Sequence, residues 1–257
     1  MFSVAIQLYS VRREMAEDFE GTLRRIAEMG YDGVEFAGLH GKDYAEAKAI
    51  CERYGLTPIS SHIQVRFIEA DPALPAGYAT IGTPYMAIPG HQWDSEDFDT
   101  SIERIRASCE ATAAVGIKMH YHNHAHEIYK KIGDPYQLDA IFSRIPEDLL
   151  GCEFDVGWLA VAGEDPAAWI RRYAGRVPML HMKDFYFEQS GKAEGKNPAD
   201  LADATLGNGR LDVPAVLAAA KESGTEWLIV ELDEPETGKT PMECAADSRA
   251  YLKTLGV

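Results

Sequence analysis

Four short apolar stretches in the second half of the chain each end on side chains that can bind a metal ion. The stretches are Ile117–His124, Leu150–Asp155, Val177–Asp184 and Trp227–Glu231. Helix-length segments separate them, so we expect several strands to bring their polar ends to one place. In a parallel barrel all strands point the same way, and active sites are built at their carboxyl ends. The pattern therefore predicts an enzyme.

Three of the predicted strand ends carry a strong metal-binding group: Asp155, His181 and Glu231. Each has an ordinary structural alternative, namely a turn-capping aspartate, a buried neutral histidine or a salt bridge at the rim. Burying a carboxylate such as Glu231 after an apolar strand costs free energy unless a cation or hydrogen-bond donors compensate. One shared divalent site accounts for all three positions.

A fourth ligand is expected from the preceding stretch, where His120, His122 and His124 share strand parity and point to one side. We choose His122 because it lies near the strand end, with His124 as the alternative. Mixed imidazole and carboxylate ligands suit Mn²⁺, Zn²⁺, Co²⁺ or Mg²⁺ better than an all-oxygen calcium cage.

Strand-like and helix-like segments alternate along the whole chain. This pattern predicts an α/β protein of one domain, residues 1–257, folded as a (β/α)8 TIM barrel. The rival, an open doubly wound sheet, usually has a glycine-rich phosphate turn after its first strand, and none is present. The expected strands are Val4–Tyr9, Gly33–Phe36, Thr57–His62, Tyr85–Ile88, Ile117–His122, Gly151–Asp155, Val177–His181 and Trp227–Glu231.

The helical periodicity is clearer in some segments than in others. Periodicity predicts clear helices at Phe19–Met29 and Tyr44–Tyr54, ended by glycines. A long helix is expected at 97–115, with Asp94 or Ser95 as its cap. Residues 64–82 have little periodicity and predict a short or degenerate helix. The polar insertion at 187–208 is expected to be a lid or a loop without a role.

The net charge of −16 repels polyanions, and no local basic stripe opposes that repulsion, so no nucleic-acid partner is expected. No apolar stretch approaches the ~20 residues of a membrane span. The first residues do not resemble a signal peptide. The four cysteines are scattered without CxxC spacing, which is typical of reduced cytoplasmic thiols. Homo-oligomerisation stays open.

Seven short motifs, taken in order, resemble those of the sugar phosphate isomerase/epimerase superfamily, the xylose-isomerase-like TIM barrels. They are IQLYSVR, VEF, SSH, YHNHAHE, FDVGW, LHMKDF and VELDEP, and they span nearly the whole length. The resemblance implies a divalent ion held by Glu, Asp, His and Glu from strands five to eight. The last three of these fall on Asp155, His181 and Glu231, and the first falls at His122.

The resemblance further implies an isomerase or epimerase acting on a keto-sugar or cyclitol. Glu231 would remove a proton next to a metal-bound carbonyl, giving an enediolate. Because His122 replaces a second glutamate, the other proton carrier is expected to be Glu127, His124 or a water. Two alternatives remain: a metal-dependent lyase, either inosose dehydratase-like or keto-glycoside-cleaving, and a catalytically inactive sugar-binding subunit. Endonuclease IV shares this barrel, but the acidic balance argues against that function.

Several further residues are candidates for contact with a substrate, each with a structural alternative of similar weight. His62 follows the third strand, Glu35 lies on the second, and Lys183 and Trp158 follow the seventh and sixth. His91 and Trp93 follow the fourth strand and are weaker candidates for the pocket wall.

Overall fold

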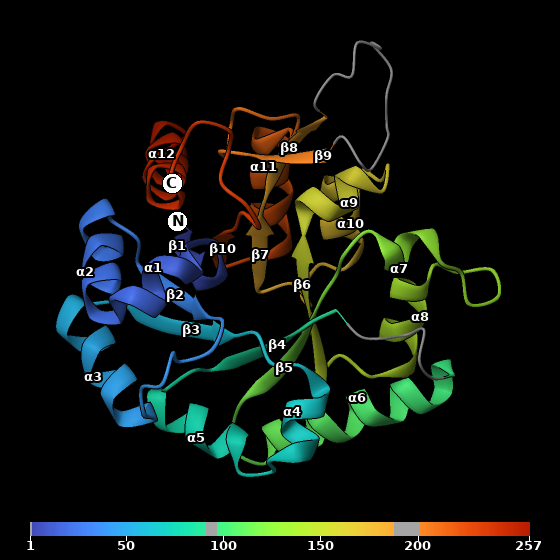
Figure 1. Ribbon diagram of the computed structural model, residues 1–257. Coiled ribbons are helices and arrows are strands. Elements are labelled where there is room, and N and C mark those ends of the chain that lie inside the picture. The colour runs from blue at the N-terminus through green and yellow to red at the C-terminus, as the bar shows by residue number, and fades with distance from the viewer. Residues whose placement is uncertain (1, 91–96, 188–200) are drawn as a thin grey trace.

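The computed structural model describes residues 2–90, 97–187 and 201–257. Within these ranges, eight parallel strands form one strongly curved sheet with helices outside it (Figure 1). The predicted (β/α)8 barrel is thereby confirmed. Its strands are β1 (Ser3–Gln7), β2 (Gly33–Phe36), β3 (Thr57–Ser61), β4 (Tyr85–Pro89), β5 (Lys118–His122), β6 (Leu150–Asp155), β7 (Met179–Met182) and β10 (Trp227–Val230).

The barrel is nearly closed. The strand order is β3-β2-β1-β10-β7-β6-β5-β4. Between the two end strands, the described pairing is a parallel bridge of His62 with Ala87, where the Ile63 N–H donates to the Ala87 carbonyl at 2.9 Å. Because every neighbouring pair is parallel, all carboxyl ends lie on one rim. The registers there place His122 opposite Glu153 and Asp155 opposite His181.

Most helices begin and end where sequence signals place them. Gly30 ends α2 and Gly55 ends α3, both in the left-handed conformation that glycine adopts without strain. The cap of α6 is Asp97, whose carboxylate accepts the Thr100 N–H at 2.9 Å. The prediction of Asp94 or Ser95 as this cap was wrong, because the helix begins at Phe98 and Asp97 is its cap; the two predicted residues lie outside the described ranges.

The described helices vary in length, and none is long and apolar enough to cross a membrane. They are the 3-10 helix η1 (Leu8–Val11) and α1 (Arg12–Glu17), α2 (Phe19–Met29), α3 (Tyr44–Tyr54), α4 (Val65–Ala70), α5 (Leu74–Ile81), α6 (Phe98–Ala113), α7 (His126–Tyr129), α8 (Gln137–Arg144), α9 (Val156–Val161), α10 (Pro166–Arg172), α11 (Val213–Ser223) and α12 (Pro241–Thr254).

Two segments depart from a simple alternation. The weakly periodic stretch at 64–82 forms two short helices, α4 and α5, with Pro72 in the turn between them. In the polar insertion, β8 (Asp184–Phe187) pairs antiparallel with β9 (Leu201–Ala204), so its two ends form a ladder rather than a loop (Figure 1).

The barrel interior has an apolar layer near the amino ends of the strands, which we call the barrel floor. It consists of Ala5, Ile59, Met179 and Ile229, each at most 3% exposed. The Tyr85 and Trp227 side chains pack against it. The floor closes the barrel from below, so the polar side chains of the next layer face the rim.

Candidate metal centre

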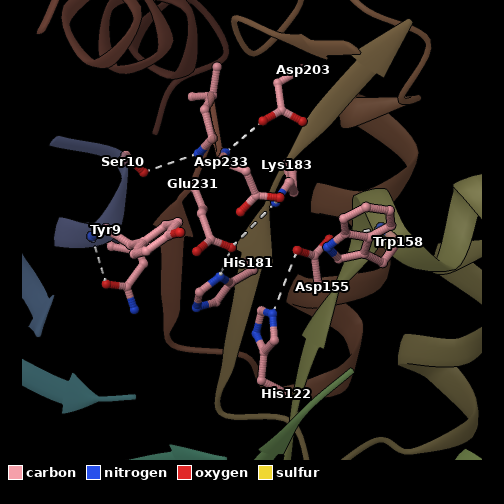
Figure 2. Close-up of polar contacts among 12 residues, drawn as sticks. Tyr9, Ser10, His122, Asp155, Trp158, His181, Lys183, Asp203, Glu231 and Asp233 are labelled. Atoms are coloured by element: carbon pink, nitrogen blue, oxygen red, sulfur yellow. Dashed lines mark hydrogen bonds and ion pairs between the residues drawn. The ribbon is translucent and has the colours of Figure 1, made fainter. Parts of the chain in front are cut away.

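Four side chains from adjacent strands converge above the barrel floor. They are His122 at the end of β5, Asp155 at the end of β6, His181 on β7 and Glu231 directly after β10, and Figure 2 shows them pointing toward one another. All four are buried, and one donor atom from each lies within 4.8 Å of the others. These are the four residues for which the sequence predicted a shared ion.

Local structure explains how Asp155 is presented. It caps α9, and its Oδ1 accepts the Trp158 N–H at 2.9 Å. Its Oδ2 is buried and has no hydrogen-bond partner in the described part of the chain. Gly157 permits this geometry, because a Cβ there would lie 2.6 Å from the Lys183 carbonyl oxygen. The helix can therefore begin directly at the strand end.

His181 lies between carboxylates on both sides. Its Nδ1 is 2.9 Å from Glu231 Oε2, and its Nε2 is 2.7 Å from Glu35 Oε2. Gln7 donates to the same Glu35 oxygen at 2.7 Å. Burial disfavours the imidazolium, but the surrounding Glu153, Glu35 and Glu231 outweigh it and raise the pKa of His181 well above its usual value. The imidazole is thus fixed at both nitrogens.

A second set of side chains lies beneath the first and shares His122 and His181 with it. Its other members are His62 and Glu153, and donor atoms of the four are also within 4.8 Å of one another. Sequence analysis missed Glu153, although it precedes Asp155 by two residues and therefore points to the same side of β6. That shared parity was the signal that could have found it.

Burial and crowded charge shift the pKa values of the carboxylates in opposite directions. Burial raises the pKa of Glu153 to about 7, with Glu35 adding to the shift. Burial also raises the pKa of Asp155 to about 7, with Lys183 opposing and Glu231 reinforcing the change. For Glu231, burial is outweighed by Lys183 and His181, which lower its pKa well below its usual value. Glu231 is therefore the carboxylate held ionised.

Lys183 is a buried partner of this cluster rather than a surface residue. Its Nζ pairs with Asp233 and lies 3.8 Å from Glu231 Oε2. The ammonium also lies 5.1 Å from the centre of the Trp158 ring (Figure 2). Burial lowers the pKa of Lys183, but the attraction of Glu231, Asp155 and Asp233 outweighs it and raises the pKa.

A cavity of about 720 Å³ opens over the cluster at the carboxyl ends of the strands. Polar groups on its wall include His62, His122, His124, Glu231 and Asp233. Its outer wall is largely apolar and contains Tyr9, Phe67, Leu74 and Tyr78. A small polyhydroxylated molecule in this cavity would contact the imidazoles and Glu231 directly.

Other candidates lie outside the ligand set. The fully buried Glu127 accepts the Tyr121 hydroxyl at 2.8 Å and the His124 N–H at 2.9 Å, so both oxygens stabilise the β5–α7 turn. His124 reaches the cavity, with its ring 5.6 Å from that of Trp158. Trp158 and Glu35 contact cluster residues but are absent from the described cavity wall.

His120 points into the barrel from β5 and is fully buried, with no hydrogen-bond partner for either ring nitrogen among the described residues. Burial lowers its pKa to about 3, so the ring is neutral. A Cβ on Gly151 would lie 2.2 Å from this ring, so glycine is required beside it. The two weaker pocket candidates, His91 and Trp93, lie outside the described residues.

The donor set fits a divalent cation. Two imidazoles and two carboxylates are ligands that transition-metal ions accept in proteins. The unpartnered Asp155 Oδ2 faces this set, and a buried carboxylate oxygen without a donor is costly unless a cation satisfies it. The raised pKa of Asp155 agrees with this, because burial is its main cause and the charge of Glu231 adds to it against Lys183.

The model of one protein family, the xylose isomerase-like TIM barrel, matches residues 23–255. The chain belongs to this family. An inosose dehydratase of Lacticaseibacillus casei is 27% identical over 164 residues, covering 61% of the chain and 53% of that protein. The chain thus spans about half the length of this family relative.

A longer but weaker match is the inosose dehydratase of Geobacillus kaustophilus, which is 21% identical over 91% of the chain and 86% of that protein. Among solved structures, a sugar phosphate isomerase/epimerase of Parabacteroides distasonis superposes with a TM-score of 0.78 at 23% identity. The superposition covers 98% of this chain and 93% of the other. This structural likeness shows the shared fold.

Proposed function

We propose that this family member is a divalent-metal-dependent enzyme that removes a proton from a carbon next to the carbonyl of a keto-cyclitol or keto-sugar. The observation that supports this proposal is the convergence of His122, Asp155, His181 and Glu231 beneath an open cavity. An ion held by these four side chains would act as a Lewis acid on the substrate carbonyl and a neighbouring hydroxyl.

Glu231 is the proposed base. It lines the cavity, and its Oε2 is held by His181 and lies near Lys183, which leaves the carboxylate ionised and oriented. Proton removal by a positioned side chain typically contributes about 10²–10⁴-fold to the rate. Lys183 stabilises this carboxylate and pairs with Asp233 at the same rim.

Dehydration, in which the substrate loses the hydroxyl on its β carbon, is the outcome we favour. Glu231 takes the C–H proton, the electron pair forms a C=C bond, and the β C–O bond breaks as His62 protonates the departing hydroxyl. His62 can supply this proton as an imidazolium, because burial, which lowers its pKa, is outweighed by Glu35 and Glu153, which raise it. Its Nε2–H is held by Glu153 at 3.0 Å, which leaves the Nδ1–H for a substrate hydroxyl. The inosose dehydratase relatives support this choice.

Isomerisation or epimerisation through the same first step is the second candidate. It requires a group that returns the proton elsewhere on the substrate. The cavity offers the imidazole of His124 for this purpose, with its ring 5.2 Å from that of His122. Glu127 is poorly placed as that group, since both of its oxygens accept hydrogen bonds from the β5–α7 turn.

The proposal is tested by incubating the protein with Mn²⁺, Co²⁺ or Zn²⁺ and a panel of keto-cyclitols and ketoses in D₂O, followed by NMR. Water loss identifies a lyase, and deuterium incorporation without water loss identifies an isomerase or epimerase. Bound metal with neither outcome on any substrate would favour a binding protein.

We place the protein in the cytoplasm, a location that its four free, buried cysteines support.

Asp155→Ala is the decisive control variant. The substitution removes a ligand oxygen that has no other described partner, so stoichiometric metal binding and the reaction should both be lost. Metal content measured after dialysis checks this expectation. Full retention of one ion per chain would place the ion elsewhere.

A further inference from the structure

Glu153 lies directly beneath the four candidate ligands. It is fully buried on β6, opposite His122 in the register of β5 and β6. Like Asp155, it points into the barrel, but it lies one layer closer to the floor.

A single oxygen of Glu153 contacts three imidazoles. Its Oε2 is 3.0 Å from His62 Nε2, 3.2 Å from His122 Nδ1 and 3.4 Å from His181 Nε2. When Glu153 is ionised, this oxygen can only accept hydrogen bonds, so an imidazole nitrogen that bonds to it must carry a hydrogen. This requirement determines where the proton of each ring resides.

A neutral imidazole has one N–H, and the other nitrogen carries a lone pair. When the His122 proton is on Nδ1, facing Glu153, the lone pair is on Nε2. That atom lies 3.9 Å from the unpartnered Oδ2 of Asp155. We propose that Glu153 is a positioning residue that fixes this tautomer of His122 and so presents Nε2 to the ion. The inference rests on the metal site proposed above.

His181 is held in a parallel manner, which supports the inference. Glu35, anchored by Gln7, accepts from Nε2 of His181 and leaves Nδ1 directed at the ligand group. Each ligand imidazole thus has an inner carboxylate behind it, an arrangement that orients metal-binding histidines generally. If an ion replaced the proton that His181 Nδ1 shares with Glu231, two neutral imidazoles and the carboxylates of Asp155 and Glu231 would balance its two charges.

The alternative is a second ion in the inner set formed by His62, His122, Glu153 and His181. Such an ion would need both His122 and His181 to bind metal through both ring nitrogens, because both also belong to the outer set. Each ring would then lose its only N–H, and Glu153 would have no donor from either. The positioning role therefore predicts one ion per chain.

The first test uses the metal-free wild-type protein with ¹⁵N-labelled histidine. Long-range ¹H–¹⁵N NMR distinguishes a protonated ring nitrogen from one with a lone pair, and His122→Ala identifies the His122 signals. We expect the proton on Nδ1. A proton on Nε2 overturns the inference, and this result needs no folded Glu153 variant.

The second test measures Zn²⁺ affinity and stoichiometry by titration. Glu153→Gln replaces the acceptor with a group that can also donate, so affinity should fall about 10–100-fold and the His122 tautomer should become mixed. Glu164→Gln alters a carboxylate that accepts from Tyr136 and Trp169 and belongs to neither candidate ligand set, so it should leave the Zn²⁺ affinity and the His122 tautomer unchanged.

Wild-type affinity in Glu153→Gln would overturn the positioning role. Two ions in the wild type and one in the variant would overturn it in favour of an inner metal site. Absence of Zn²⁺ binding by the wild type would instead remove the proposed function, while the NMR result on His122 would still decide the inference.

Discussion

The barrel interior has an apolar layer, the floor, and a polar layer next to it. The two layers lie two residues apart along a strand. On β7, Met179 belongs to the apolar floor and His181 to the polar cluster. On β1, Ala5 belongs to the floor and Gln7 holds Glu35. Successive inward-facing residues are two positions apart, so the two layers are adjacent on the same strands.

The two layers contribute differently to the free energy of folding. Burying a side chain such as that of Ile59 or Met179 stabilises the fold by about 1.5–3 kcal/mol. Burying carboxylates and imidazoles costs free energy unless each is paired. Of these two layers the floor therefore contributes more to stability, whereas the cluster is retained for chemistry. Substitutions in the two layers should therefore have separable effects.

The largest expected effect is in the polar layer, from Glu231→Gln. The amide keeps the size of the side chain but cannot accept the C–H proton, so deuterium exchange into substrate should fall by about 10²–10⁴-fold. Thermal unfolding should change little. Exchange near the wild-type rate would assign the base to another residue and remove the contrast between the layers.

The matching change in the floor is Ile59→Ala, at a residue that is 3% exposed. Large-to-small substitution in a packed core costs about 2–5 kcal/mol in the free energy of unfolding. Metal affinity should stay within a few-fold of wild type, since Ile59 contacts no ligand. Denaturant unfolding and Zn²⁺ titration measure the two quantities, and Ile59→Val should show a smaller loss of stability. A large loss of affinity would show that the layers are coupled.

Within the polar layer, His122→Ala and His124→Ala separate a ligand from a cavity wall residue. His122 belongs to both candidate ligand sets and His124 to neither. The first substitution should weaken Zn²⁺ binding at least about 10-fold more than the second. The reverse order, measured by competition with a chelator, would show that His124 is the β5 ligand.

The smallest expected effect is the pH dependence of metal affinity. In the metal-free protein burial raises the pKa of Asp155 to about 7, with Glu231 adding to the shift against Lys183. Protons on Asp155 and on His181, whose pKa is also raised, compete with the ion, so affinity should rise more steeply with pH below about 7 than above it. A flat profile between pH 5.5 and 8 would contradict this assignment, and Ile59→Val should reproduce the wild-type profile.

The sequence alone located the rim residues, because each strand end is marked by a polar residue that directly follows an apolar run. Apolar runs ending at Asp155 and His181 could be read without any tertiary information, and parallel connectivity then required their ends to meet. The same reasoning identified α2 and α3 to the residue, since glycine ends both. It missed the β8–β9 ladder, which depends on pairing between segments that the sequence does not mark.

The composition and periodicity of this chain determined the barrel, the rim on which its chemistry lies and the four candidate ligands, because each follows from a local pattern repeated along the strands. Only the tertiary structure decided which ring nitrogen of His122 and of His181 faces which carboxylate. It also decided that Lys183 is buried and that Glu127 accepts hydrogen bonds in the β5–α7 turn. Those outcomes depend on contacts between distant strands and on the exclusion of water from a shared interior. No local pattern contains that information.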